Sequence, residues 1–311
     1  MTRSAEAGSG LVGSALMGFA WLSPMVAGLL LFGCQGPAPT SNPHYVLGGP
    51  YQAGGVWHYP AESLTLDETG LASVLPGGSG RLTTDGEAFD QTAMAAAHAT
   101  LQLPSIARIT NLENGLQTTV RINDRGTGNP ARIAEVTRRV AELLRFPPDG
   151  VARVRVQVLQ AETRATVEAV PGAPNLGVAA APRGAVEVAD LAPPPGVASG
   201  GGRPVAASAG GDTPSLSAGP APPLRLPETV SRTAPQPGQL MVWLDTFQQQ
   251  SYAAQQRARM ADAGARVVSF RQDRRQLYRT EIGPLPDVAS ADSILRQALA
   301  RGIPDARIVV N

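Results

Sequence analysis

Alternating apolar and polar positions mark several short strands in the middle of the chain. The segments 106–110, 118–122 and 151–158 place apolar side chains at every second position, which is the period of a half-buried β-strand. An Asn-Gly pair between the first two segments is typical of a tight hairpin. Apolar residues every three or four positions predict a helix over 133–144. We therefore expect a small, mainly β domain here.

A second pattern follows near the carboxyl end, where strand and helix spacings alternate. It predicts strand, helix, strand, strand, helix and strand, over 239–247, 251–264, 266–270, 276–282, 289–301 and 306–310. This order is that of a ferredoxin-like split βαβ unit. The pattern therefore predicts an α+β domain over 238–311.

A stretch rich in proline, glycine and alanine separates the two predicted domains. Residues 170–237 contain no aromatic side chain and few charges. Such a stretch cannot bury enough apolar surface to offset the entropy of ordering it. We predict a disordered linker over 163–237, and the length of 311 residues then leaves room for two modest domains.

The amino end has the pattern of an export signal. Arg3 precedes an apolar stretch over 11–32, and Cys34, the only cysteine, follows Leu-Phe-Gly. A bacterial lipoprotein signal places its cysteine at this point, so we expect a signal peptide over 1–33. Acyl chains on Cys34 would anchor the protein in a membrane, and 34–69 would lead into the first domain.

Two other interpretations of the amino end remain open. Cys34 could be a buried free thiol, or the apolar stretch could be an uncleaved transmembrane helix, because it approaches spanning length. Gln35 follows the cysteine in place of the aspartate that retains such lipoproteins in the inner membrane. We therefore expect attachment to the outer membrane, facing the periplasm.

Charge and motifs exclude several classes of ligand. The formal net charge is +1, and no basic run with interleaved aromatic residues occurs, so we do not expect nucleic-acid binding. There is no Cys/His spacing suited to zinc and no glycine-rich phosphate loop between a strand and a helix. We therefore expect neither a metal nor any other cofactor.

Four side chains between residues 81 and 126 are candidates for chemistry: Glu87, Asp90, His98 and Asp124. Each alone has a simple structural explanation. Asp124 lies in an Asn-Asp-Arg-Gly turn, Asp90 could cap a helix ending near His98, and Glu87 follows a turn. Each structural explanation accounts for one residue only. The presence of three carboxylates and one imidazole in one region is better explained by a site that transfers protons at a polar substrate.

The same region carries three motifs in order: TTDGEAFDQTAMAAAH, LPSIARITNLENG and VRINDRG. In them the chain resembles the rare lipoprotein A family of lytic transglycosylases. The resemblance implies a double-psi β-barrel over 70–162. It also implies cleavage of the bond between N-acetylmuramic acid and N-acetylglucosamine in peptidoglycan, preferably in peptide-stripped glycan strands, leaving a 1,6-anhydro end.

The resemblance also implies roles for the four side chains. Asp124 would be the acid and later the base, Glu87 and His98 would orient substrate and stabilise charge, and Asp90 would fix the imidazole tautomer. A solvated aspartic acid, with a pKa of about 3.9, is ionised at neutral pH. We therefore expect Asp124 to be buried and to carry a proton.

Two further features bear on the function. Where the family has Trp-Tyr, this chain has Val74 and Leu75, so a non-catalytic peptidoglycan-binding tether remains the alternative to an enzyme. The segments 282–285 and 302–308 resemble the SPOR domain, which binds glycan strands stripped of peptide. That resemblance implies action in septal cell-wall remodelling and daughter-cell separation, with division-site proteins as partners.

Overall fold

The computed structural model describes residues 40–78, 80–174 and 225–311. The predicted signal peptide, Cys34 and the central part of the predicted linker lie outside these residues. Within the described ranges, no helix is both long enough and apolar enough to cross a membrane.

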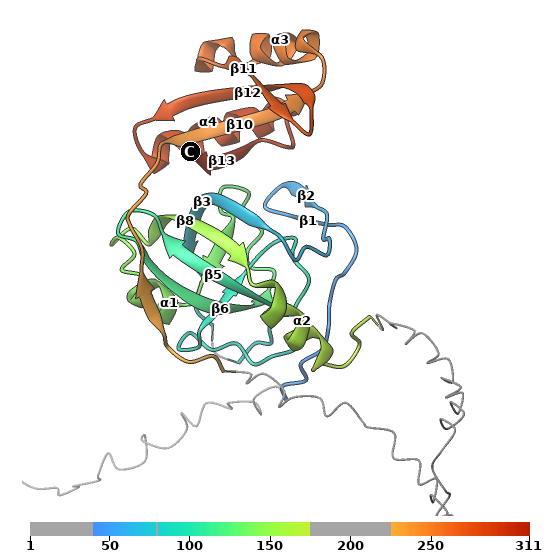
Figure 1. The fold of residues 1–311 in the computed structure, drawn as a ribbon, viewed down its shortest axis with the longest axis vertical. Helices are drawn as coiled ribbons and strands as arrows, with labels where there is room; N and C mark the ends of the chain where they lie inside the picture. Colours follow the sequence, from blue (N-terminus) through green and yellow to red (C-terminus); the bar gives the residue numbers. More distant parts are fainter. Residues whose placement is uncertain (1–39, 79, 175–224) are drawn as a thin grey trace, which may run out of the picture. The chain divides into compact units, whose positions relative to one another are not determined.

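Six strands close into a barrel (Figure 1): β3 (Asp67–Val74), β4 (Ala95–Ala97), β5 (Ser105–Asn111), β6 (Leu116–Asp124), β7 (Ala134–Val136) and β8 (Val151–Val158). They pair in the order β4-β7-β3-β8-β5-β6, and β6 pairs again with β4, which closes the ring. The β3–β7 and β4–β6 pairs are parallel, and the other four are antiparallel. The predicted mainly β fold with a double-psi β-barrel is thereby confirmed.

Alternation along the long strands fills the barrel with aliphatic side chains. Ile109 of β5, Val120 and Ile122 of β6, and Val154 and Val156 of β8 all have no exposed surface. Each fully buried side chain of this size contributes about 1.5–3 kcal/mol through the hydrophobic effect. Because Ile122 is fixed in this core, the two residues that follow it on β6 have a defined position.

The structure differs from the helix predicted over 133–144. Only Arg138–Leu143 is helical (α1), and residues 134–136 form β7, which pairs with β3 and β4. Ala134 and Val136 are two positions apart, so they fit the strand period as well as the helical one. Closure of the barrel, a contact between distant segments, selects the strand.

The ordered structure also extends into both ends of the predicted linker. Helix α2 (Gln160–Glu168) is held by buried Thr163, whose hydroxyl accepts from Ile106 N (3.0 Å) and donates to Ile106 O (3.1 Å). Strand β9 (Val230–Arg232) pairs with the first residues of β6. The range 163–237 is therefore too wide, because composition does not reveal such polar contacts.

An amino-terminal segment precedes the barrel and is bound to it. Val46 pairs with Leu103 through two backbone hydrogen bonds of 2.8 and 2.9 Å. A two-stranded hairpin follows, made of β1 (Tyr51–Ala53) and β2 (Val56–His58). This segment leads into β3.

The carboxyl-terminal unit has the predicted element order. It consists of β10 (Leu240–Phe247), α3 (Gln250–Arg259), a 3-10 turn (Ala261–Ala263), β11 (Arg266–Gln272), β12 (Arg275–Leu285), α4 (Val288–Ala300) and β13 (Arg307–Val310). The antiparallel sheet has the order β11-β12-β10-β13. Leu240, Val242, Leu244, Met260 and Leu295 are buried in its core. The ferredoxin-like βαββαβ arrangement is confirmed.

Candidate active site

Three segments meet at the carboxyl end of β6. The loop over 81–90 is joined to the strand by a hydrogen bond from Asp85 N to Asn123 O (3.2 Å). The residue after β4, His98, donates its backbone N–H to Asp124 O (3.0 Å). Three of the four predicted site residues, Glu87, His98 and Asp124, are therefore gathered around one strand end.

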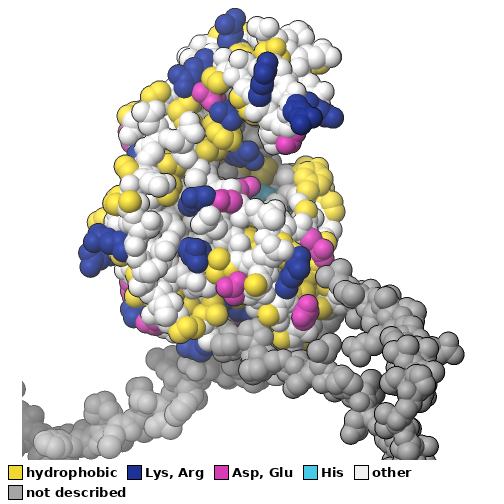
Figure 2. Space-filling view, viewed as in Figure 1, with side chains coloured by type: hydrophobic (Ala, Val, Ile, Leu, Met, Phe, Trp, Pro, Cys, Tyr) yellow, Lys and Arg dark blue, Asp and Glu magenta, His cyan; other side chains and the backbone are white. Residues whose placement is uncertain are grey.

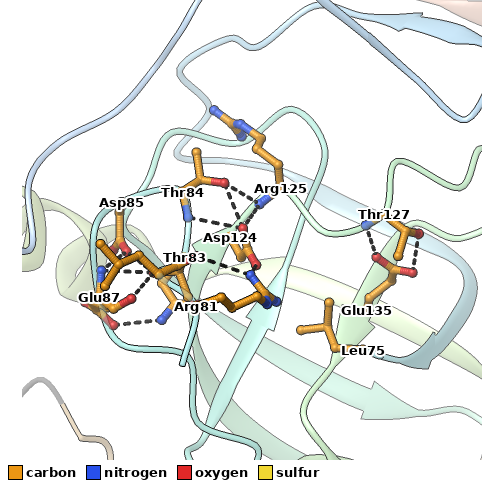
Figure 3. Close-up of polar contacts among 12 residues, drawn as sticks. Leu75, Arg81, Thr83, Thr84, Asp85, Glu87, Asp124, Arg125, Thr127 and Glu135 are labelled. Carbon is orange, nitrogen blue, oxygen red and sulfur yellow. Dashed lines mark hydrogen bonds and ion pairs between the residues drawn. The ribbon is translucent and has the colours of Figure 1, made fainter. Parts of the chain in front are cut away.

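Both carboxylate oxygens of Asp124 accept hydrogen bonds (Figure 3). Its Oδ1 accepts from Thr84 N (3.1 Å), Thr84 Oγ1 (2.7 Å) and Arg125 N (2.9 Å). Its Oδ2 accepts from Arg81 Nη1 at 2.7 Å. The side chain is buried as expected, but each of these contacts donates a hydrogen bond to the carboxylate, which does not match the protonated acid that we expected.

The two oxygens of Asp124 have different surroundings. Backbone and hydroxyl donors fix Oδ1, whereas the one partner of Oδ2 among the described residues is Arg81, whose side chain is 38% exposed. The Arg81 guanidinium also stacks on the Phe89 ring, 3.8 Å from its centroid, which is the geometry of a cation–π contact. Arg81 therefore contacts Asp124 from the solvent-exposed side, and its contact is separate from those to Oδ1.

Glu87 forms a buried ion pair on the same loop. Its Oε1 accepts from Arg121 Nε (2.6 Å) and its Oε2 from Asn123 Nδ2 (2.7 Å). Arg121 and Asn123 belong to β6, so Glu87 ties the loop to the strand that carries Asp124. A pocket of about 210 Å³ is lined by Glu87, Asp90, Arg121 and Asn123 among others.

Asp85 is a buried carboxyl that the sequence analysis did not select. Its Oδ1 accepts from Thr83 Oγ1 (2.7 Å) and Glu87 N (3.2 Å), whereas Oδ2 has no hydrogen-bond partner among the described residues. Burial, and then the nearby charge of Glu87, raise the pKa of Asp85 to about 7. Asp85 lies in a turn, where a buried carboxyl is not expected from the residue pattern.

His98 is buried and neutral. Its Nδ1 accepts the backbone N–H groups of Thr100 and Leu101, both at 3.2 Å, so the ring proton is on Nε2. Burial lowers the pKa of His98 to about 4, and the charges of Arg125 and His58 act in the same direction. The imidazole is therefore a hydrogen-bond donor through Nε2 at neutral pH.

Asp90 does not have the position expected for it. Its Oδ1 accepts from Thr92 N (2.8 Å) and Thr92 Oγ1 (2.7 Å), and its Oδ2 pairs with Arg225. It therefore does not fix the His98 tautomer, which backbone N–H groups fix instead. The helix that Asp90 could have capped is also absent, since residues 95–97 form β4.

Arg125 and Glu135 are two further residues that the sequence analysis missed. The Arg125 guanidinium donates to three backbone oxygens, of Leu47 (2.7 Å), His98 (3.3 Å) and Leu101. Glu135 of β7 accepts from Thr127 N (2.5 Å) and Thr127 Oγ1 (2.6 Å), as Figure 3 shows. Both side chains fix the turn after Asp124, and the motif letters alone do not show their partners.

The two positions that lack the family's aromatic pair have different surroundings. Val74 packs against the barrel core. Leu75 is 3% exposed, its backbone N–H donates to Val136 O (2.8 Å), and its side chain lines the same pocket as Glu87. An aliphatic side chain therefore takes the place of an aromatic ring at this pocket. Among the residues that the structure describes, no cluster of three or more His, Cys, Asp or Glu could hold a metal ion.

Fold and site together define a double-psi β-barrel that holds carboxylates and a neutral imidazole at one strand end. Residues 67–156 match the family model described as lytic transglycolase. The expected likeness to the rare lipoprotein A family is confirmed for this region.

Three curated relatives illustrate the match, and each is named endolytic peptidoglycan transglycosylase RlpA. That of Rickettsia bellii is 36% identical over 124 residues, 39% of this chain and 55% of the relative. That of Campylobacter jejuni is 39% identical over 113 residues, which are 35% of this chain and 41% of the relative. That of Vibrio cholerae is 41% identical over 80 residues, which are 26% of this chain and 30% of the relative. The chain spans between 39% and 56% of the length of the first four relatives.

Proposed function

We propose that this protein is a lytic transglycosylase that cleaves the bond between N-acetylmuramic acid and N-acetylglucosamine in peptidoglycan, preferably in peptide-stripped strands. The observation that carries the proposal is the gathering of Asp124, Glu87 and His98 at the end of β6 in a lytic transglycolase barrel. An acid is needed at the leaving oxygen while positive charge develops at the anomeric carbon.

Asp124 is the general acid and base in this proposal, and Oδ2 is its reacting oxygen, because Oδ1 is fixed by Thr84 and Arg125. On substrate binding Arg81 leaves Oδ2, which takes up a proton from solvent. Asp124 gives this proton to the glycosidic oxygen as the bond from that oxygen to the anomeric carbon breaks. The 6-hydroxyl oxygen of the muramic sugar bonds to the anomeric carbon and returns its proton to Oδ2, so no water is consumed.

Glu87 and His98 assist without exchanging protons with the substrate. Glu87 fixes the loop that carries Arg81 and Thr84, through its contacts with Arg121 and Asn123. His98 remains neutral at pH 7 because its pKa is about 4, so its Nε2–H is available to a substrate oxygen. Asp90, at the pocket shared with Glu87, contributes to the lining rather than to the chemistry.

Digestion of purified peptide-free glycan strands tests this proposal. We expect the wild-type protein to release products with 1,6-anhydro ends, and Asp124→Asn to reduce the rate by about 10²- to 10⁴-fold, the usual contribution of a general acid. Asn keeps an oxygen for the donors around Oδ1, so the loop should stay in place. Equal release by both proteins would remove Asp124 from the mechanism. Sedimentation with sacculi without any release would favour the non-catalytic tether.

We further infer that the unit over 238–311 is a SPOR-like module for peptide-free glycan, which supports a role at the division site. Its βαββαβ order and the segments 282–285 and 302–308 support this assignment. A second glycan contact on one chain would raise the local substrate concentration at the barrel. Sedimentation with peptide-free strands and with untreated sacculi tests it, and equal binding to both would contradict it.

Lipidation of Cys34 and attachment to the outer membrane, facing the periplasm, complete the proposal. The support is the position of the only cysteine after an apolar stretch and Leu-Phe-Gly, together with Gln35. Metabolic labelling with a palmitate analogue should mark the wild-type protein and not Cys34→Ala. Recovery of an unlabelled wild-type protein in the soluble fraction would contradict the anchor.

A further inference from the structure

The β1–β2 hairpin lies beside the candidate active site. The Tyr51 hydroxyl donates to Ala99 O (2.8 Å), one residue after His98, and the Tyr51 ring stacks on His58 with centroids 5.1 Å apart. The pKa of Tyr51 is raised by burial, and the charges of Arg125 and Asp124 also act on it. The hairpin is therefore continuous with the site that holds Asp124.

Glycines allow the hairpin to approach the turn after Asp124 closely. A Cβ atom on Gly54 would collide with Gly128 O, and one on Gly128 would collide with the Cβ of Ala53. Both glycines also have positive φ, 58° and 69°, which other residues rarely adopt. The hairpin therefore packs against the loop over 126–130 through backbone contacts.

The hairpin carries an unusual share of the exposed aromatic surface. Only five large apolar side chains are exposed in the part of the chain that the structure describes, and two of them, Trp57 (58%) and Tyr59 (66%), are two residues apart here. Figure 2 shows hydrophobic side chains gathered at this place, beside acidic and histidine side chains. Exposed aromatic side chains next to a site mark a binding surface.

The chemistry of this surface selects its ligand. Residues 51–59 read YQAGGVWHY and contain no Asp, Glu, Lys or Arg. Along β2, Val56 and His58 are less exposed than Trp57, which places Trp57 on the outer face. Flat rings with uncharged polar neighbours suit the apolar face of an uncharged sugar ring, such as the N-acetylglucosamine of the strand, whereas an acidic peptide or a nucleic acid requires cationic partners.

We propose that Trp57 and Tyr59 form an outer sugar subsite, which binds rings of the same glycan strand beyond the two sugars joined by the cleaved bond. This inference rests on the proposed function for the identity of the strand. His58 is stacked on Tyr51, and Tyr51 contacts Ala99 beside His98, so these two residues connect the subsite to the candidate active site. The subsite therefore acts only on strands long enough to extend past the hairpin.

Strand length provides the test. The rate of release of anhydro ends is measured at limiting substrate, on long peptide-free strands and on the shortest fragment that the wild-type protein cleaves. For Trp57→Ala/Tyr59→Ala we expect a roughly 3- to 10-fold loss on long strands, from one or two lost ring contacts. We expect no loss on the shortest fragment, which reports an intact site. Trp57→Phe/Tyr59→Phe should retain most of the activity on long strands.

Matched controls make the outcome decisive. Val230→Ala removes another exposed apolar side chain, on β9, which pairs with the opposite end of β6, and should change neither rate. An equal rate of wild type and double alanine variant on long strands would overturn the subsite, and so would an equal loss on both lengths.

Binding separates this inference from the proposed function. If the wild-type protein releases no anhydro ends, the proposed function fails, and sedimentation with long peptide-free strands then tests the hairpin alone. Weaker sedimentation of the double alanine variant, with wild-type behaviour of the double phenylalanine variant, would support the subsite. Equal sedimentation of all three proteins would overturn it.

Discussion

The barrel and the carboxyl-terminal unit bury charge very differently. The barrel buries Asp85, Glu87, Arg121, Asp124 and Glu135, whereas among the described acidic and basic residues of the carboxyl-terminal unit only Glu281 is buried. Taking a charge out of water is costly unless partners compensate it. A fold that needed only stability would place these groups on the surface, as the carboxyl-terminal unit does. The excess of buried ionisable side chains therefore costs the barrel stability, and it coincides with the candidate active site.

The largest expected effect comes from Arg121→Met, which leaves Glu87 buried with Asn123 as its remaining side-chain partner. Removing one partner of a buried ion pair costs about 3–5 kcal/mol. Arg266→Met is the matched change in the carboxyl-terminal unit, because Arg266 pairs with Glu281 but is 53% exposed and leaves Arg279 in place. We expect that variant to lose less than about 1 kcal/mol.

Urea denaturation of both variants, followed by circular dichroism, measures these losses. Arg121→Met should show the lower midpoint by a wide margin. Similar losses in the two variants would show that the ion pairs of the two regions contribute equally to stability, which would contradict the difference described above.

The sequence predicts the regular strands well and the closure of the barrel poorly. Residues 151–158 alternate strictly, because one face of β8 packs in the core. β4 is three alanines and β7 contains two apolar residues in a helical pattern, so neither carries a strand signal of its own. Both strands form because they pair with β6 and β3, which are distant in sequence.

The same limit applies to the candidate site, where the sequence indicates the residue types but not their contacts. The motifs indicate Glu87, His98 and Asp124, because their side chains can move protons. They do not show that Thr84 and Arg81 hold Asp124, since those contacts span 40 and 43 residues. The tautomer of His98 depends on backbone N–H groups, which every residue but proline possesses. Residue type therefore predicts the chemistry, and only the fold assigns the partners.

The second prediction concerns His98 and acid. The folded pKa of about 4 lies below the unfolded value of 6.5, so between these values the unfolded chain takes up a proton that the folded chain does not. This contribution to stability is complete above pH 6.5 and is lost as the pH falls to 4, by about 2–3 kcal/mol. His98→Asn removes it and keeps an oxygen for the two backbone N–H groups.

Unfolding free energies at pH 7.5 and pH 4.5 test this sign. The difference in unfolding free energy between wild type and His98→Asn should be smaller at the lower pH, because only the wild type loses stability when its unfolded chain protonates His98. A gap that does not change with pH would mean that His98 titrates normally in the folded protein.

The third prediction concerns Asp85 and has the opposite sign. Its folded pKa of about 7 lies above the unfolded value of 3.8, so the folded chain retains a proton that the unfolded chain has lost. Stability from this group is present below about pH 4 and is lost as the pH rises to 7. Relative to that of the wild type, the free energy of unfolding of Asp85→Asn should therefore increase by about 1–3 kcal/mol between pH 4.5 and pH 8.

The same unfolding measurements decide this case. Asp85→Asn and His98→Asn should change relative to the wild type in opposite directions along the pH axis, so that each is the other's control. If the stability of Asp85→Asn relative to the wild type fell with rising pH, as expected for His98→Asn, the buried carboxyl would be ionised in the folded protein.

The smallest expected effect is that of Arg81→Ala on stability. Arg81 pairs with Asp124, but its side chain is 38% exposed whereas that of Arg121 is 3% exposed, so water can replace the lost donor. We expect a loss of about 1 kcal/mol or less, measured by urea denaturation beside Arg121→Met. The three donors to Asp124 Oδ1 stay in place. A loss as large as that of Arg121→Met would mean that Arg81 is a fixed structural partner, and Oδ2 would then be unavailable to a substrate.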